Sequence, residues 1–521
     1  MNYKRINNIT GWMICLVACI VYIMTMEATG SLWDCGEFAS SAYKLQIPHP
    51  PGAPLFVLIG RLFMIPFDPQ HAATGVNLMS ALASGFTILF LFWSITHFAK
   101  KMLQPKDAEM SNQQLFTVMA AGVVGALAYT FSDTFWYSAV ESEVYALSSF
   151  FTAVVFWAAL KWEDAVTEEQ KAGIKGHFTS ADRWLILIFY LMGLSIGVHL
   201  LNLLTIPAIV MLYYFKRYSV TTWGTFFAFV IGCIITGVVQ KFVIQSTIKG
   251  AGALDILFVN DFGLPFFTGF AFFFILLAVL IWFGLRIAKK NNWNFLRLGL
   301  WAMSFMLLGY SSYITTLMRS NADPSVDMYN VDNPVSLVGY LSREQYGDTP
   351  IMFGADFTAG NVSGEEYQPD YINEDTYIKT DNGYEKKGRK QTVKYQSQDE
   401  HLFPRMWDAG NEQGHADYYA DFADIVKDPK TGAWSNKPSM ADNISFFTQY
   451  QVGWMYLRYF MWNFVGKQND IQGVNMANVR DGNWKSGIGL WDKMRLGNQQ
   501  QMPDSMKYNK ANNKLYALPF I

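Results

Sequence analysis

Cysteine is scarce in this sequence, with four residues among 521. Cys15, Cys19 and Cys233 lie in apolar stretches, Cys35 lies in a polar loop, and residues 318–521 contain none. A disulfide framework is therefore excluded for that last part of the chain. Charged residues are also few, at 16%, and the formal net charge is −2. This balance excludes a nucleic-acid-binding protein, because such proteins carry a basic excess.

The signatures of soluble enzymes are absent as well. The sequence has no nucleotide-binding P-loop, no dinucleotide-binding glycine fingerprint after a strand, no Gly-x-Ser-x-Gly elbow and no His-Glu-x-x-His motif. An enzyme without a nucleotide site needs a substrate that is already activated before it arrives. A lipid-linked sugar phosphate, delivered by the membrane, meets this requirement.

Apolar residues, by contrast, are abundant. The chain is 51% hydrophobic and 16% aromatic, which excludes a disordered protein. Residues 1–317 are dominated by apolar runs, whereas residues 318–521 are polar and rich in Asp, Asn, Gly and Tyr. The predicted fold class is an α-helical polytopic membrane protein, with a membrane domain over 1–317 and a mixed α/β extracytoplasmic domain over 318–521.

A membrane-spanning helix needs about 20 mostly apolar residues. Nine stretches meet or approach this length, and residues 184–215 can also form one broken unit. The stretch 53–67 is apolar too, but Arg61 and the flanking Pro54 and Pro66 favour a re-entrant or interfacial helix. The predicted spans are 11–26, 76–98, 115–131, 143–160, 184–198, 200–215, 223–243, 265–285 and 296–317.

The distribution of Lys and Arg predicts the orientation of these spans. With the N-terminus in the cytoplasm, fifteen basic residues fall in the N-terminal segment and the inner loops. The outer loops of the membrane domain carry only Lys44, Arg61 and Lys249. Residues 11–26 resemble a signal peptide, but no small-x-small cleavage site follows them, which favours a retained anchor. The polar domain is therefore predicted to face outward.

Ionisable side chains collect in the predicted outer loops, close to the hydrocarbon boundary. Charged groups at that depth are costly unless they are paired or functional, so these residues are candidates for a functional site. They are Asp34, Glu37 and His49 in the first outer loop (27–75), Asp133, Glu141 and Glu143 between the third and fourth spans, His199 between the fifth and sixth, and Arg319 after the last.

Asp34 and Glu37 are the strongest of these candidates. They are three residues apart and share one face of a helix, and the neighbouring Trp33 and Phe38 indicate a partly buried setting. Carboxylates in such a position can act as a general base toward a hydroxyl. They can also bind a divalent cation, together with Glu141 and His49 as further ligands, or relay protons in a transporter.

Ordinary structural explanations stay open for the other candidates. Asp133 lies in a Ser-Asp-Thr turn, which favours a solvated residue or a cap of the next helix. Glu141 and Glu143 are two residues apart, so that only one of them points inward if they lie on a helix. His199 lies between apolar runs, where a packed histidine is more common than a ligand.

Five stretches occur in order along the chain: WDCGEF…HPPGAPLF, VESEVYAL, GVHLLN, REQYGDTP and RYFMWNFVGKQNDIQG. Together they resemble a family of bacterial multi-pass membrane proteins, glycosyltransferase family 117, which includes a vertebrate membrane protein O-mannosyltransferase. The resemblance implies a GT-C fold, a helical bundle whose first outer loop carries the catalytic acid. It also implies inverting transfer of mannose or a similar hexose from a polyprenyl-phosphate carrier to Ser or Thr hydroxyls of exported proteins, at the periplasmic face of a bacterial inner membrane.

The resemblance further implies roles for individual residues. Asp34 would be the general base, and Glu37 would orient the acceptor or support the base. The other implied roles are contacts to sugar or acceptor for Glu141 and Glu143, and contacts to the donor phosphate for His49, His199 and Arg319. Some GT-C enzymes use a divalent metal and others do not, so metal dependence stays open.

Members of this family continue with further membrane spans and a helical-repeat region, whereas this chain ends at KLYALPFI. We therefore expect it to be part of a longer protein. Two other classes of function stay open: a proton- or cation-coupled secondary transporter, and a non-catalytic subunit of an envelope complex. The spans contain few ionisable groups and the acids cluster at one interface, which favours the enzyme over the transporter.

The extracytoplasmic domain gives weaker patterns. Residues 348–357, DTPIMFGADF, predict a strand that ends in a glycine turn. Residues 355–440 are polar and have little periodicity, which predicts long surface loops or an insertion. Residues 444–466 are apolar and aromatic but interrupted by Gln, Gly and Arg458, which predicts an amphipathic helix at the bilayer surface or a core helix of this domain.

Overall fold

The computed structural model describes residues 2–104, 110–174, 178–344, 350, 352–363, 370–406, 414–473, 476 and 478–517. The chain forms two compact units. The first contains Met1–Gln345 and Lys379–Tyr384, and the second contains Tyr346–Ile378 and Glu385–Ile521. The first unit thus extends past residue 317, where the composition of the sequence changes.

Seven helical segments of the first unit are long and apolar enough to cross a membrane, within the described part of the chain. This confirms the predicted class, a helical polytopic membrane protein. The segments are α1 (Tyr3–Thr25), α4 (Ala72–Leu103), α5 (Asn112–Thr130), α7 (Val144–Lys171), η2 with α9 (Leu200–Thr205 and Ile206–Arg217), α10 with η3 and α11 (Thr222–Val238, Val239–Ser246 and Thr247–Asn260), and α12 (Thr268–Lys290).

The two remaining predicted spans, 184–198 and 296–317, form shorter helices. They are α8 (Arg183–Ile196) and α13 (Asn294–Tyr310). Gly193 and Gly309 let their backbones approach closely, because a Cβ atom on Gly193 would lie 2.2 Å from the carbonyl oxygen of Met306. The nine-span count stays a prediction.

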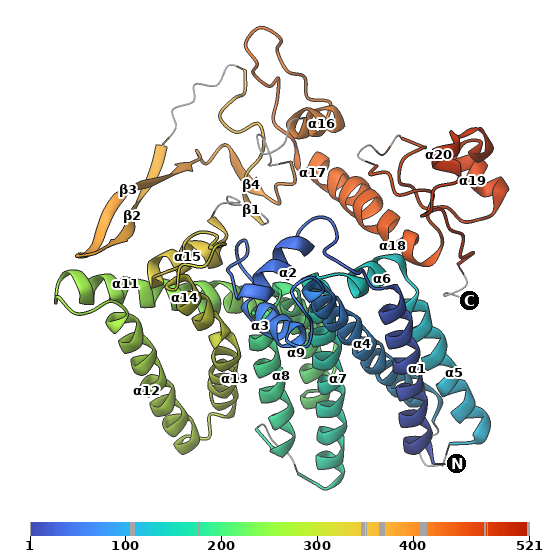
Figure 1. Ribbon diagram of the computed structural model, residues 1–521, viewed down its shortest axis with the longest axis horizontal. Helices are drawn as coiled ribbons and strands as arrows, with labels where there is room; N and C mark the ends of the chain where they lie inside the picture. Colours follow the sequence, from blue (N-terminus) through green and yellow to red (C-terminus); the bar gives the residue numbers. More distant parts are fainter. Residues whose placement is uncertain are drawn as a thin grey trace. The chain divides into compact units, whose positions relative to one another are not determined.

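Five short helices lie at one end of the long helices (Figure 1). Among them is α3, the helix that the sequence predicted at the interface, and Pro54 occupies its first turn. The five are α2 (Cys35–Lys44), α3 (Pro54–Met64), α6 (Asp133–Val140), α14 (Ile314–Ser320) and α15 (Pro334–Ser342).

Basic residues of the predicted inner loops form ion pairs with acidic residues of the helical bundle. Lys101 at the end of α4 and Lys216 at the end of α9 both pair with Glu163 of α7. Arg217 pairs with the buried Asp182 in the 3-10 turn η1 (Ser180–Asp182), at 3.1 Å. Figure 1 shows the N-terminus and the α12–α13 connection at the end opposite to α2 and α6. These basic residues of the predicted inner loops are therefore held in ion pairs with acids, and the orientation of the bundle in a membrane stays a prediction.

Residues 353–402 contain two short two-stranded sheets, most of which belong to the second unit, while the turn Lys379–Tyr384 belongs to the first. Strands β1 (Phe353–Ala355) and β4 (Glu400–Leu402) pair with each other, and β2 (Asp370–Thr380) pairs with β3 (Gly383–Lys394). Strand β1 lies inside the predicted strand 348–357, of which residues 348, 349 and 351 lie outside the described residues. The β2–β3 hairpin lies where the sequence predicted long surface loops or an insertion. Its strands are mostly exposed and lack an apolar face, so the period-2 signal is weak. The turn dipeptide Asn382-Gly383 was the available signal.

Residues 440–464 form one continuous helical segment of α17 (Met440–Phe446), η6 (Phe447–Leu457) and α18 (Arg458–Phe464). Phe446 packs in a core with Phe357 and Trp434. The buried guanidinium of Arg458 donates to the carbonyl of Gly482 at 3.0 Å. These contacts make the segment a core helix of the second unit. The other helices there are α16 (His415–Phe422), α19 (Gly489–Leu496) and α20 (Asp504–Lys507).

Candidate functional site

Glu37 and His49 form a two-point polar contact within the first outer loop. Glu37 lies in the first turn of α2, and its carboxylate oxygens accept hydrogen bonds from the backbone N–H of His49 and from its ring Nδ1, each at 2.7 Å. The other ring nitrogen, Nε2, lies 3.9 Å from an oxygen of Asp34, the residue that precedes α2. Asp34 is the most exposed of the three, with 56% of its side chain accessible, against 27% for Glu37 and His49.

These contacts set the protonation of the pair. The hydrogen bond to Glu37 raises the pKa of His49, the negative charge of Asp34 adds to this effect, and burial and Arg343 oppose it. Burial raises the pKa of Glu37, but the hydrogen bonds from His49 outweigh it and hold the pKa below its usual range. The pair therefore favours an ionised carboxylate beside a cationic imidazole.

Two tyrosines hold the turn that carries His49. The hydroxyl of Tyr340 donates to the carbonyl of Pro48 at 2.6 Å, and the hydroxyl of Tyr313 donates to the carbonyl of Gly52 at 3.3 Å. Gly52 has a φ of 69°, and a Cβ atom there would lie 2.1 Å from the Tyr340 hydroxyl. Only glycine fits at this position, so the imidazole is held in a preorganised turn.

The second acidic loop, between α6 and α7, lies against the first. The hydroxyl of Ser31 donates to Glu141 at 2.8 Å, and the thiol of Cys35 lies 3.6 Å from an oxygen of Glu143. Glu143 is only 8% exposed. Burial, with the charge of Asp34 next, raises its pKa to about 7. The structure thus brings both acidic loops together, with Glu143 as the buried member.

Asn77 holds these two loops in place, and sequence reasoning missed it. It is fully buried in α4, and its amide donates to the carbonyls of Glu27 and Thr29 at 2.7 and 3.0 Å. Its oxygen accepts a hydrogen bond from Ser142 at 2.5 Å. An asparagine inside an apolar span is costly without partners, which was the signal that could have found it.

His199 and Arg343 extend the site. The ring of His199 lies 5.4 Å from that of Tyr145, and its Nδ1 accepts the N–H of Leu201 at 3.2 Å. Burial lowers the pKa of His199, and Arg343 lowers it further. Because Arg343 also acts on His49, it is the cation shared by both imidazoles. Sequence reasoning missed Arg343, although it begins the stretch REQYGDTP.

Arg319, a predicted site residue, lies away from the cluster of Asp34, Glu37 and His49. Arg319 donates from Nε to the carbonyl of Leu45 at 2.8 Å and from its terminal nitrogen to that of Lys44 at 3.2 Å. It therefore lies at the C-terminal end of α2, about 15 Å along the helix from Asp34. Of the two aromatic residues that indicated a partly buried setting for the acid pair, Phe38 is 5% exposed and Trp33 is 92% exposed.

Asp34, Glu37 and His49 also form a possible set of metal ligands. One ligand atom from each lies within 4.8 Å of the others. Both oxygens of Glu37 already accept hydrogen bonds from His49, however, so the free ligand atoms are those of Asp34 and Nε2 of His49. Glu141 does not belong to this group. A divalent cation fits only as a two-residue site with Glu37 as the orienting carboxylate.

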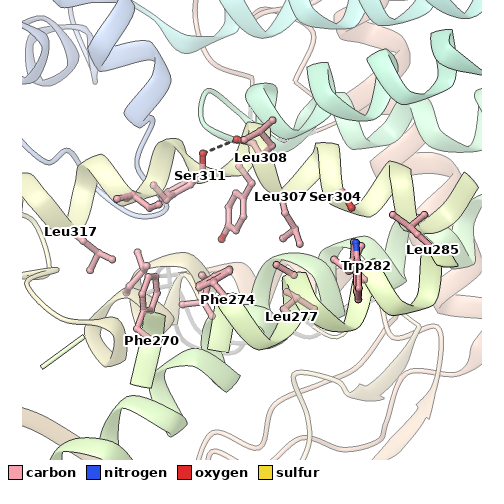
Figure 2. Close-up of a pocket in the computed structure, with 17 residues that line it drawn as sticks. Phe270, Phe274, Leu277, Trp282, Leu285, Ser304, Leu307, Leu308, Ser311 and Leu317 are labelled. Carbon is pink, nitrogen blue, oxygen red and sulfur yellow. Dashed lines mark hydrogen bonds between the residues drawn. The ribbon is translucent and has the colours of Figure 1, made fainter. Parts of the chain in front are cut away.

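An apolar cavity of about 500 Å³ lies between α12 and α13. Figure 2 shows Phe270, Phe274, Leu277 and Trp282 of α12 on one side and Leu307 of α13 on the other. Tyr313, the residue that donates to Gly52, lines it as well. The cavity therefore reaches the residues that support the His49 turn.

The comparisons with known proteins match two parts of the chain. Residues 34–222 match the family described as Protein O-mannosyl-transferase TMEM260 N-terminal domain. Residues 347–448 match a family of unknown function, DUF8416. Asp34, Glu37, His49, Glu141, Glu143 and His199 all fall in the first match.

Curated proteins that resemble the chain include two O-mannosyl-transferases. Protein O-mannosyl-transferase TMEM260 of Mus musculus is 25% identical over 154 residues, which is 30% of this chain and 20% of that protein. Protein O-mannosyl-transferase tmem260 of Dictyostelium discoideum is 25% identical over 198 residues, 37% of this chain and 21% of that protein. The match thus spans about a fifth of each relative. No solved structure matches the chain. These findings support an O-mannosyltransferase-like family of membrane proteins.

Proposed function

We propose that this chain is a membrane glycosyltransferase that moves mannose or a similar hexose from a polyprenyl-phosphate carrier to Ser or Thr hydroxyls of exported proteins, with inversion. The observation that carries the proposal is the cluster of Asp34, Glu37 and His49 beside Glu143. It lies in the segment that matches the O-mannosyl-transferase TMEM260 N-terminal domain.

In the proposed reaction the acceptor hydroxyl attacks C1 of the sugar from the face opposite to the lipid phosphate. The new bond joins the hydroxyl oxygen to C1, and the bond from C1 to the phosphate oxygen breaks. The hydroxyl proton passes to Asp34, and the lipid phosphate leaves with the electron pair of the broken bond. Asp34 suits the role of base because its carboxylate is the exposed member of the cluster.

Glu37 acts through His49 rather than on the substrate. Both of its oxygens hold His49, and this fixes the ring so that Nε2 points toward Asp34. The imidazole, whose pKa is raised by the hydrogen bond to Glu37, places positive charge 3.9 Å from the carboxylate that takes the acceptor proton. Glu37 is therefore a positioning residue, and His49 supports the base.

Arg343 and His199 are the proposed contacts of the donor phosphate. Arg343 carries a permanent positive charge near both imidazoles, and such a charge stabilises the negative charge that develops on the departing phosphate. Arg319, a residue of α14, contacts the C-terminal end of α2 and is too far from Asp34 for this role. Glu141 and Glu143, on the adjacent loop, are the proposed contacts of the sugar or the acceptor.

The apolar cavity between α12 and α13 is the proposed place of the lipid chain (Figure 2). Its lining is aliphatic and aromatic apart from Ser304 and Ser311, and Tyr313 links it to the turn of His49. A chain held there would bring its phosphate toward the acid cluster. The predicted setting is a bacterial inner membrane with this cluster and the second unit facing the periplasm.

The test is a transfer assay with the purified protein in liposomes. The substrates are a mannosyl-phosphoryl-polyprenol and a Ser/Thr peptide, and mass spectrometry measures the glycosylated peptide. We expect a product in which the mannose has the anomeric configuration opposite to that of the donor. Retention of the donor configuration, or the absence of transfer with glucose- and mannose-bearing donors alike, would contradict the proposal.

A further inference from the structure

A second cavity, of about 420 Å³, lies beside the C-terminal end of α2. Three cationic side chains line it: Lys44 from α2, Arg61 from α3 and Arg319 from α14. Asp323 is the one carboxylate among its lining residues. The cavity therefore has a surplus of positive charge.

These cations have no ion pair within the described part of the chain. Arg319 donates only to the carbonyls of Lys44 and Leu45, which fix its position but leave its charge uncompensated. Arg61 lies over the ring of Tyr43, at 5.4 Å from its centroid. Three neighbouring positive charges repel one another, so an anion between them would lower the free energy of the site.

Basic residues are rare in the predicted outer loops, yet most of them line this cavity. The predicted outer loops of the membrane domain carry three basic residues, and two of them, Lys44 and Arg61, line this cavity together with Arg319. On the same helix as Arg61, Leu62 and the following Ile65 are 64% and 65% exposed. A cationic cavity beside an exposed apolar helix face matches the chemistry of a membrane–water boundary, where phosphate groups of lipids lie.

We infer that Lys44, Arg61 and Arg319 form a binding site for a phosphate group, supplied by an anionic lipid headgroup or by free phosphate. The site is separate from the proposed transfer site, since about 15 Å of helix α2 lies between Lys44 and Asp34. It does not depend on the proposed function. Arg319 keeps further N–H groups besides those that bind the carbonyls of Lys44 and Leu45, and Lys44 and Arg61 add charge.

The test measures the thermal unfolding of the purified chain in a neutral detergent. Inorganic phosphate is titrated in one arm, and phosphatidylglycerol, against phosphatidylcholine, in another. We expect a saturable rise of the unfolding temperature of about 2 °C or more in at least one anionic arm. A response to inorganic phosphate identifies a free-anion site, and a response to phosphatidylglycerol alone identifies a headgroup site.

The variants are K44Q with R61Q, and K249Q serves as the matched control because Lys249 is the third outer basic residue and does not line the cavity. Arg319 is left unchanged because it caps α2. The double variant should bind the anion about tenfold or more weakly than the wild type does. K44R keeps the positive charge at position 44 and should keep the contribution of Lys44. K249Q should bind the anion as the wild type does. No response in either anionic arm, or an equal loss in K249Q, would overturn the inference.

Discussion

Nδ1 of His49 and a carboxylate oxygen of Glu37 lie 2.7 Å apart, and the second oxygen of Glu37 accepts the backbone N–H of the same histidine. One carboxylate thus fixes both the backbone and the ring of one residue. The consequence is that His49 presents Nε2 toward Asp34. The contacts therefore run in order from Glu37 through the imidazole of His49 to the exposed carboxylate of Asp34.

Replacing Asp34 by Asn should abolish sugar transfer. The amide cannot accept the hydroxyl proton, and loss of a general base lowers kcat by about 10²–10⁴-fold. Because 56% of this side chain is exposed, insertion and thermal stability should be unchanged. The measurement is initial rate in liposomes beside a melting curve. Full activity of a correctly folded D34N protein would remove the assignment.

Glu37→Gln should lower kcat by about 10–100-fold and leave KM for the acceptor nearly unchanged. The amide cannot hold His49 as an ionised carboxylate does, so the pKa of His49 should fall and the pH profile of kcat should change shape. The matched control is Asp68→Asn, which breaks the exposed Asp68–His71 contact of 2.8 Å in the same loop. If E37Q and D68N had equal effects, Glu37 would have no special role.

Glu143 should make the stability of the protein depend on pH. Burial raises the pKa of this carboxyl from 4.5 to about 7 in the folded state, so its contribution is fully present below pH 4.5 and is lost as the pH rises through 7. Glu143→Gln mimics the protonated form. The variant should melt at a higher temperature than the wild type at pH 8 and at the same temperature at pH 4.5. A constant difference across this range would contradict the assignment.

Chelation should leave transfer active. The hydrogen bond to Glu37 raises the pKa of His49, and a protonated imidazole cannot bind a metal. Both oxygens of Glu37 are also engaged by that residue. The check is the transfer rate after EDTA treatment and dialysis. Activity that falls with EDTA and returns with Mg²⁺ or Mn²⁺ would place a cation between Asp34 and His49 instead.

Leu277→Trp should obstruct the α12–α13 cavity. Leu277 lines this cavity, whereas Leu280 on the same helix is 58% exposed and does not line it. L277W should raise KM for a long polyprenyl donor and affect a donor with a short chain much less. L280W is the matched control. Equal effects of the two variants on both donors would show that the chain binds elsewhere.

Much of the helical architecture followed from the sequence, because apolar length is a local property. The seven long helices include most predicted spans, and the predicted inner cations Lys101, Lys216 and Arg217 meet at one end. The hairpin of residues 370–394 was missed because its strands have no apolar face. The two strands are held by their backbone pairing, which the side-chain pattern of the sequence does not show.

Residue type and position in the sequence predicted that acids and histidines collect near one membrane face. The tertiary structure alone decided which of them meet. It joined Glu37 to His49 and Glu143 to Cys35, placed Arg343 near both imidazoles, and took Arg319 to the other end of α2. The physical reason is that a charged side chain near lipid must find partners, and those partners come from segments far apart in the chain.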